Sequence, residues 1–391
     1  MKLKFHNSPE PEKFATDLLP KELPAFLTYE PDWQKMEAAV LKYSHIKNIL
    51  VIAHGGSLTG FYGLYESLKS LATKKAYFLQ TVDPDYIHEL KLVLSPEDTL
   101  VIPISKSGEN STQIEAFLQF QEYPLLFVTG EGSPLYHIAE TLGKDIFIHP
   151  VIGGRYTGFT EVLLLPALLC GLPAKEFFEG GREVHKTFSL QNDAWHMASV
   201  FWQLEKKGFV DVFMPFYSHY LFPWNLVIVQ LCHESFGKDG KGGTYLAFEA
   251  PESQHHTNQR FFGGIKNMAG LFLGVESFTN KLQTHVTQNL ANITFKSESV
   301  KTLDTIPLDQ SLRFELEGTL EDASGQGTPC VSLTLPKVES RSVGEFLAFW
   351  QLYAVYSSLL RNVDPFDQPQ VEASKALSFQ KRQSYKPTTQ Q

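Results

Sequence analysis

Short runs of apolar residues alternate with longer amphipathic stretches through the first half of the chain. These runs lie at residues 48–53, 76–81, 99–104, 124–129 and 145–149. Runs that are apolar at consecutive positions and separated by helix-like stretches are typical of strands buried on both faces of a parallel sheet. The pattern therefore predicts a doubly wound α/β domain over residues 30–185, preceded by an N-terminal extension over residues 1–29.

The same alternation resumes in the second half of the chain. Apolar runs at residues 208–217, 243–249 and 271–275 predict further buried strands. We therefore expect a second α/β domain over residues 186–340. The fold class predicted for the whole chain is α/β, with two three-layer α/β/α domains that have mainly parallel sheets, plus C-terminal helices.

The C-terminal region has a different pattern. Residues 342–360 are rich in apolar and aromatic side chains and predict one long helix. This helix belongs to a C-terminal helical segment that we place over residues 341–380. The remaining residues, 381–391, are polar, and we expect them to form a disordered tail.

Composition narrows the possible functions. The chain of 391 residues is 43% hydrophobic and 20% charged, as an ordinary globular protein is. Its net charge of −9 argues against nucleic-acid binding and against attraction to an anionic membrane. The N-terminus has no apolar run of signal-peptide length, and no run is long enough to span a bilayer. We therefore expect a cytoplasmic protein with neither nucleic acid nor membrane as a partner.

The cysteines and the short motifs exclude several kinds of site. Cys170, Cys232 and Cys330 are widely spaced and form neither a CxxC pair nor a metal-ligand pattern, so we expect buried, unpaired thiols in a reducing compartment. His255 and His256 are adjacent, but no HxH, HExxH or Cys/His cluster completes a metal site. The nucleotide motifs GxxxxGK[ST] and GxGxxG are also missing. We expect no metal and no cofactor.

Two predicted strands, at residues 48–53 and 99–104, run directly into small polar turns that precede a helix. The turn residues that we regard as candidate substrate-binding groups are Gly56, Ser57, Ser105, Lys106, Ser107 and Asn110. Ligands of open α/β sheets bind at the carboxyl ends of strands, where helix N-termini offer free N–H groups and a partial positive charge. These turns suit a phosphate monoester. Alternatively, Ser57 and Ser111 simply cap their helices.

Two later segments carry candidate catalytic groups. A Gly-Gly-Arg turn places Arg155, whose charge is permanent, beside bare backbone, where it can stabilise a developing negative oxygen. Alone, the same turn is compatible with a surface arginine. Gln230 and Glu234 are four residues apart in a predicted helix, so they share one face of it.

Taken together and in order, six segments resemble the sugar-isomerase (SIS) domain superfamily, and specifically the phosphoglucose isomerase family. They are Gly55-Gly56-Ser57, Ser105-Lys106-Ser107-Gly108, VIGGRYTG at 151–158, QLCHESFGK at 230–238, PESQHHTNQ at 251–259 and NVDPFDQPQVEASK at 362–375. In the second of these, the family usually continues with Thr-Thr and then Glu. This chain has Glu109, Asn110 and Thr112 at those places.

The resemblance implies an aldose–ketose isomerase that interconverts glucose 6-phosphate and fructose 6-phosphate in glycolysis and gluconeogenesis. It implies that Glu234 is the base that moves a proton between C2 and C1, and that Arg155 stabilises the enediolate. His255, with His256 as the alternative, would open the sugar ring with help from Lys375. The family also implies a homodimer in which the partner supplies His255.

Three further hypotheses on function remain open from the sequence. Relatives that also isomerise mannose 6-phosphate tend to carry threonine where this chain has Gln368, so the resemblance favours the glucose-specific form. The isomerase half of a glucosamine-phosphate synthase would share the Ser-Lys-Ser-Gly loop, but it should lack the segments around Glu234, His255 and Lys375. A non-catalytic SIS-domain sensor would normally add a basic DNA-binding module, which the acidic composition disfavours.

Overall fold

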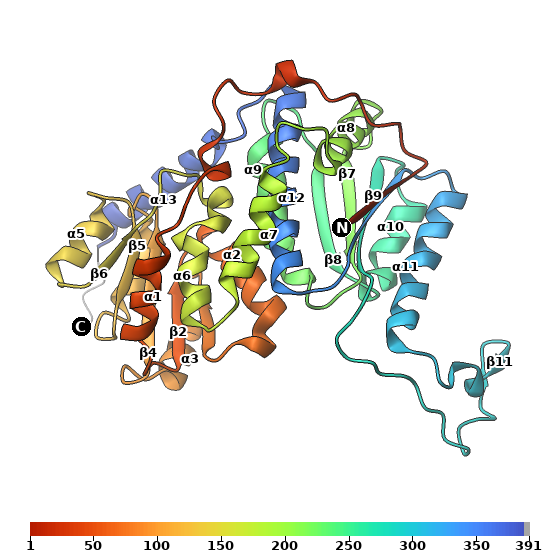
Figure 1. Ribbon diagram of the computed structural model, residues 1–391, viewed down its shortest axis with the longest axis horizontal. Helices are drawn as coiled ribbons and strands as arrows, with labels where there is room; N and C mark the ends of the chain where they lie inside the picture. The colour runs from red at the N-terminus through yellow and green to blue at the C-terminus, as the bar shows by residue number, and fades with distance from the viewer. Residues whose placement is uncertain (387–391) are drawn as a thin grey trace.

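Two separate β-sheets, each flanked by helices, form the frame of the molecule (Figure 1). The computed structural model describes residues 1–386. The first sheet has the strand order β3-β2-β4-β5-β6, and all of its neighbouring strands are parallel. Its strands are β2 (Asn48–Ile52), β3 (Lys75–Leu79), β4 (Thr99–Ser105), β5 (Leu126–Thr129) and β6 (Asp145–Ile148). Each overlaps one predicted run, so the predicted parallel sheet is confirmed.

Alternate residues of the central strand β2 face two different hydrophobic clusters. Ile49 and Val51 pack into one cluster, whereas Leu50 and Ile52 pack into another, and all four are fully buried. Burial on both faces explains why this strand is apolar at every position. The helices of this half of the chain are α1 (Trp33–Lys42), α2 (Gly56–Leu68), α3 (Pro84–Val93), α4 (Ser111–Leu118), α5 (Pro134–Thr141), α6 (Glu161–Leu169) and α7 (Ala174–His185).

The second sheet has the strand order β1-β12-β9-β7-β8 and is parallel except for its edge strand β1. Its strands are β1 (Lys2–His6), β7 (Asp211–Phe216), β8 (Thr244–Glu249), β9 (Met268–Val275) and β12 (Cys330–Leu335). The N-terminal segment thus crosses the molecule to pair with β12, which the sequence pattern does not predict. Its alternation of lysine with apolar residues is typical of an edge strand that keeps one face in solvent.

The helices that follow α7 are α8 (Asp193–Lys206), α9 (Asn225–Phe236), α10 (Thr257–Gly263), α11 (Leu308–Gly325), α12 (Ser340–Arg361) and α13 (Glu372–Ser384). The helix predicted over residues 342–360 is α12, and its side chains are buried almost all round. It packs against α7, α8 and α9 and lies between the two sheets (Figure 1). A helix that is apolar on every side is stable only in such an interior position.

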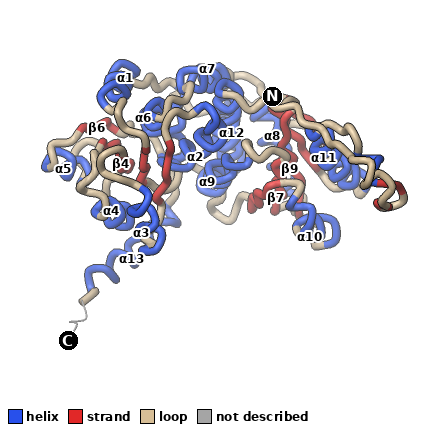
Figure 2. The backbone as a smooth tube through the Cα atoms, turned by 90° about the horizontal axis from the view of Figure 1, so that it is seen from below, coloured by secondary structure: helices blue, strands red, loops and turns tan. Residues whose placement is uncertain are grey.

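Helix α13 returns to the first sheet after α12 (Figure 2). Arg382 near its end donates from Nε and Nη2 to the carboxylate of Glu115 on α4, at 2.6 and 2.8 Å. Because α13 extends to Ser384, the first residues of the predicted tail are helical, which corrects that expectation; residues 387–391 lie outside the described part.

A long segment projects from the second sheet between β9 and α11 and carries the short hairpin β10 (Thr294–Phe295) and β11 (Glu298–Ser299) (Figure 1). The three cysteines are buried and unpaired, as expected. Across residues 1–386, none of the helices combines the length and the apolar character needed to cross a membrane.

Candidate active site

The first polar turn lies against the arginine segment. Gly55 caps α2 with a left-handed backbone (φ 55°), and α2 begins at Gly56. A Cβ atom at Gly56 would lie 2.3 Å from the backbone of both Gly154 and Arg155, so only glycine allows this approach. Ser57 is buried in the first turn of the helix. The predicted first loop and the predicted arginine segment therefore meet directly.

The second polar turn is folded by its own side chains. Ser105 Oγ accepts the N–H of Gly108 at 3.1 Å, and Ser107 Oγ accepts that of Glu109 at 3.3 Å. Asn110 is the N-cap of α4, and its Oδ1 accepts the N–H of Gln113 at 3.3 Å. Lys106 and Ser107 are exposed. Because β2 and β4 are adjacent and parallel, both turns lie at the same edge of the sheet.

Arg155 contacts the candidate base. It lies in a 3₁₀ turn (Gly154–Phe159), and its side chain is 1% exposed. Arg155 Nη1 donates to Glu234 Oε2 at 3.1 Å, and Arg155 Nε donates to the hydroxyl of Ser235 at 2.9 Å. Glu234 is near the end of α9, and 28% of its side chain is exposed. The ion pair is therefore buried on the arginine side and open on the carboxylate side.

The same guanidinium also binds the loop that follows α12. Arg155 Nη1 donates to Gln368 Oε1 at 2.8 Å, and Nη2 donates to the carbonyls of Pro365 at 2.5 Å and Asp367 at 3.1 Å. Lys238, one turn beyond Glu234, is also buried and donates to Asp367 Oδ1 at 2.5 Å and to the Asp367 carbonyl at 2.8 Å. Two buried cations thus hold the 365–368 loop beside Glu234.

Gln230 links Glu234 to the first turn. Its Nε2 donates to Glu234 Oε1 at 3.1 Å, as expected for residues one helical turn apart. A Cβ atom on Gly55 would lie 2.9 Å from the same nitrogen, so the first turn packs onto this amide. Both carboxylate oxygens of Glu234 therefore accept a hydrogen bond, one from Gln230 and one from Arg155.

In the described part of the chain, Lys375 and His255 are exposed and make no hydrogen bond or ion pair with the cluster formed by Arg155, Glu234, Gln230 and Gln368. Lys375 lies on α13, is exposed and pairs with Glu372 Oε1 at 2.8 Å. Its positive charge contributes, after burial, to lowering the pKa of His54 in the first turn. His255 is exposed, and its side chain makes no hydrogen bond or ion pair with any residue in 1–386. It precedes α10, which lies farther from the first sheet than α9 does in both views (Figures 1 and 2).

The structure adds one residue that the motifs do not single out. His54 precedes Gly55, and its Nε2 lies 2.8 Å from Thr112 Oγ1 in the second turn. Burial lowers the pKa of His54, and the charge of Lys375 lowers it further. In the sequence, His54 is marked only by its position directly before the Gly-Gly-Ser turn.

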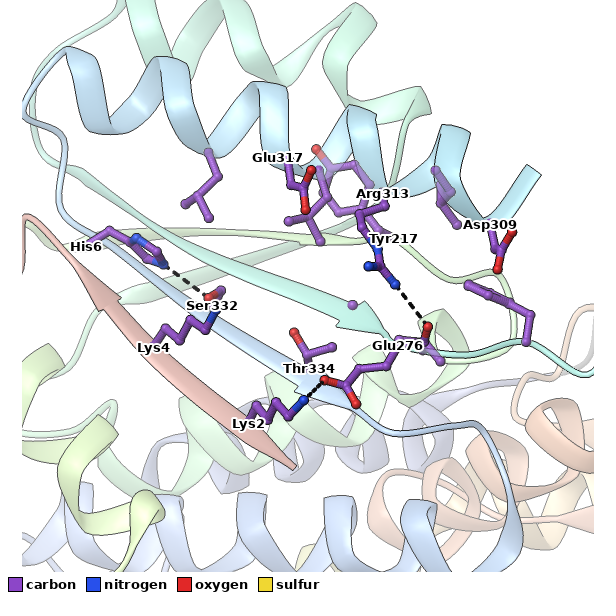
Figure 3. A pocket seen from close by; sticks show the side chains of 16 residues that line it. Lys2, Lys4, His6, Tyr217, Glu276, Asp309, Arg313, Glu317, Ser332 and Thr334 are labelled. Carbon is purple, nitrogen blue, oxygen red and sulfur yellow. Dashed lines mark hydrogen bonds and ion pairs between the residues drawn. The ribbon is translucent and has the colours of Figure 1, made fainter. Parts of the chain in front are cut away.

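A groove of about 470 Å³ lies elsewhere, between α11 and the β1 side of the second sheet (Figure 3). Lys2, Lys4 and His6 line one wall, and Arg313 and Glu317 line the other. None of the predicted site residues borders it. Within the part of the chain that the structure describes, no group of three or more His, Cys, Asp or Glu side chains is placed to hold a metal ion.

Comparison with known proteins shows which proteins this chain is similar to. No family model matches the sequence. A curated protein from Levilactobacillus brevis named glucose-6-phosphate isomerase is 26% identical in an alignment that covers 90% of this chain and 86% of that protein.

Two solved structures have a similar fold. A hypothetical protein from Thermus thermophilus superimposes with a TM-score of 0.82 at 25% identity, over 90% of this chain and 87% of that one. A glucose-6-phosphate isomerase from Chlamydia trachomatis superimposes with a TM-score of 0.73 at 18% identity, over 98% of this chain and 82% of that one. Over most of its length, this chain is a homologue of proteins named glucose-6-phosphate isomerase and shares the fold of phosphosugar isomerases.

Proposed function

We propose that the protein is a glucose-6-phosphate isomerase, which interconverts glucose 6-phosphate and fructose 6-phosphate. The observation that carries this proposal is the contact between Arg155 and Glu234, which pairs a permanent buried cation with a partly exposed carboxylate beside two turns suited to a phosphate. Homology to curated isomerases over nine-tenths of the chain supports the same activity.

The phosphate would bind across the two turns at the edge of the first sheet. Ser57 stands in the first turn of α2, where free N–H groups and the helix dipole favour an anion. Lys106 and Ser107 on the second turn are exposed and available as further donors. With the phosphate bound there, the C1–C2 end of an open-chain sugar can extend towards Glu234.

Proton transfer follows from the position of Glu234. Its carboxylate removes the C2 proton of the open-chain aldose, and the electron pair moves to the carbonyl oxygen, which gives a cis-enediolate. A proton passes from the hydroxyl oxygen O2 to O1, and Arg155 stabilises the negative charge on these oxygens. The carboxylic acid of Glu234 then returns its proton to C1 as the electron pair on O2 forms the ketose carbonyl. The adjacent carbonyl makes the C–H bond acidic enough for a carboxylate base. A positioned acid–base group of this kind contributes about 10²–10⁴-fold in rate.

Ring opening requires a further acid–base group, which we assign to His255 with help from Lys375. Within one chain His255 is exposed and apart from the Glu234 cluster. We therefore propose a homodimer in which a second copy supplies His255 to the site. We also propose a cytoplasmic location, because three buried, unpaired cysteines are typical of a reducing compartment.

Gln368 bears on the choice of sugar. Its Oε1 accepts from Arg155 beside Glu234, so its amide is next to the atoms that would react. We propose that the enzyme prefers glucose 6-phosphate to mannose 6-phosphate. A purified sample should form glucose 6-phosphate from fructose 6-phosphate, and it should form mannose 6-phosphate much more slowly. Failure to convert fructose 6-phosphate would refute the proposed activity, and equal rates for both sugars would refute the preference.

A further inference from the structure

The two polar turns are tied together twice by neighbouring residues of α4. Deep in the sheet, the amide of Gln113 donates to the carbonyl of Ile52 at the end of β2, at 2.8 Å, and to that of Ile104 on β4, at 2.5 Å. Gln113 is 3% exposed, so this tie is part of the core. Nearer the surface, Thr112 contacts His54, and both residues are only half-buried.

Which of His54 and Thr112 donates the hydrogen bond between them follows from the other partners of Thr112. The backbone N–H of Gln113 can only donate, so the atom of Asn110 that faces it is the oxygen Oδ1. Thr112 Oγ1 lies 2.7 Å from the same oxygen and therefore donates its single proton to it. Thr112 has no proton left for His54, so His54 Nε2 must carry the hydrogen and donate to Thr112.

The result is a directed chain from His54 through Thr112 to Asn110. It begins one residue before the Gly-Gly-Ser turn and ends at the N-cap of α4. Thr112 is the shared member of this chain, so rotation of its side chain breaks the bond to His54 in the first turn and the bond to Asn110 in the second. Burial lowers the pKa of His54, so near neutral pH its other ring nitrogen, Nδ1, is an acceptor without a proton.

We propose that His54 is a positioning residue for the phosphate site: through Thr112 and Asn110 it fixes the second turn relative to the first. The hydrogen-bond donors of the first turn and those of the second turn can then bind the same phosphate group. This role rests on the proposed function, because it assumes that a phosphate monoester binds across both turns.

The test measures binding separately from turnover. Calorimetry gives the Kd of fructose 6-phosphate and of inorganic phosphate for wild type, His54→Leu, His54→Gln, Thr112→Val and the His54→Leu/Thr112→Val double variant. Glutamine can place a donor N–H near the position of the histidine Nε2, so we expect His54→Gln to stay within about threefold of wild type. We expect His54→Leu and Thr112→Val each to weaken binding of both ligands by about tenfold, which corresponds to the loss of roughly one hydrogen bond.

The double variant decides whether the two residues act as one unit. If they do, it should bind about as weakly as either single variant, and the KM for fructose 6-phosphate should rise in parallel while kcat changes by less than about threefold. Independent, multiplying effects would overturn the proposal, as would wild-type affinity in His54→Leu. Thr112→Ser, which keeps the hydroxyl, should bind as wild type does and is the folding control.

Failure of the two proposals is distinguishable. A wild-type protein that binds fructose 6-phosphate without isomerising it would refute the proposed activity, while the His54 comparison would still be decided by the Kd values. A wild-type protein that binds neither fructose 6-phosphate nor inorganic phosphate would refute the positioning role itself.

Discussion

Arg155 Nη1 lies 3.1 Å from Glu234 Oε2, although the two residues are 79 positions apart and come from different halves of the chain. Helix α12 packs against both α7 and α9, and so fixes the frame in which this contact forms. The pair therefore reports on the packing of the two halves as well as on the chemistry of the site.

Replacing Arg155 with lysine should keep the positive charge but lose the hydrogen bonds that hold the site together. Lysine cannot reproduce a planar fork that reaches Glu234, Gln368, Ser235 and two backbone carbonyls at once. We expect kcat for fructose 6-phosphate to fall at least about 10²-fold, together with a lower melting temperature. Steady-state kinetics and thermal denaturation measure both effects. Wild-type kcat in Arg155→Lys would show that the fork geometry does not matter.

A methyl group at Gly56 should disrupt the contact between the first turn and the Arg155 segment. The added Cβ would lie 2.3 Å from backbone atoms of Gly154 and Arg155, so one of the two segments must move. We expect Gly56→Ala to weaken fructose 6-phosphate binding more than about tenfold and to destabilise the fold by about 1–3 kcal/mol. Isothermal calorimetry and urea denaturation are the measurements.

The matched control is Gly318→Ala. Gly318 lies within α11, and nothing approaches a Cβ atom there within 4 Å. Alanine is favoured over glycine in a helix by about 0.5–1 kcal/mol, so this variant should be as stable as wild type or slightly more so. Equal loss of stability in both variants would argue against the close approach at Gly56.

Two buried histidines predict that stability falls in mild acid. Burial lowers the pKa of His149 to about 4 and that of His185 to about 3, from 6.5 in an unfolded chain. Below pH 6.5 the unfolded chain therefore binds protons that the folded protein does not. The free energy of unfolding should decrease as pH falls from 6.5 towards 4, by up to about 1.4 kcal/mol per pH unit for each histidine.

Urea denaturation at pH 7, 6 and 5 measures this dependence. His149→Gln should remove the share of one histidine from the slope, whereas replacement of the exposed His88 by glutamine should leave the slope unchanged. A slope that is the same in wild type and in His149→Gln would contradict the assignment of His149 as a buried neutral group.

Periodicity predicted those parts of the fold that are buried on both sides. The central strands of the first sheet are apolar at most positions, and helix α12 is rich in apolar and aromatic residues and buried on nearly every side. Strand β1 was not predicted, because its pairing with β12 joins residues more than 300 positions apart and leaves one face exposed. Local patterns contain no information on such a pairing.

The site could be predicted residue by residue only where a motif was specific. Three separate segments single out Glu234, Arg155 and Gln368, and in the structure Arg155 donates a hydrogen bond to each of the other two. His54 and Lys238 could not be assigned a role in this way, because their partners, Thr112 and Asp367, are distant in sequence. His255 was predicted for the same site and lies apart from it within one chain, so its role depends on a second copy.

The central claim is that the Glu234 carboxylate carries the proton between C2 and C1. The most direct measurement is kcat for fructose 6-phosphate in Glu234→Gln, with the Kd of the sugar phosphate measured on the same sample and Glu97→Gln, an exposed site, as the control. We expect kcat to fall at least about 10²-fold in Glu234→Gln while the Kd changes by less than about threefold. A Glu234→Gln protein that binds and isomerises fructose 6-phosphate at the wild-type rate would contradict the account.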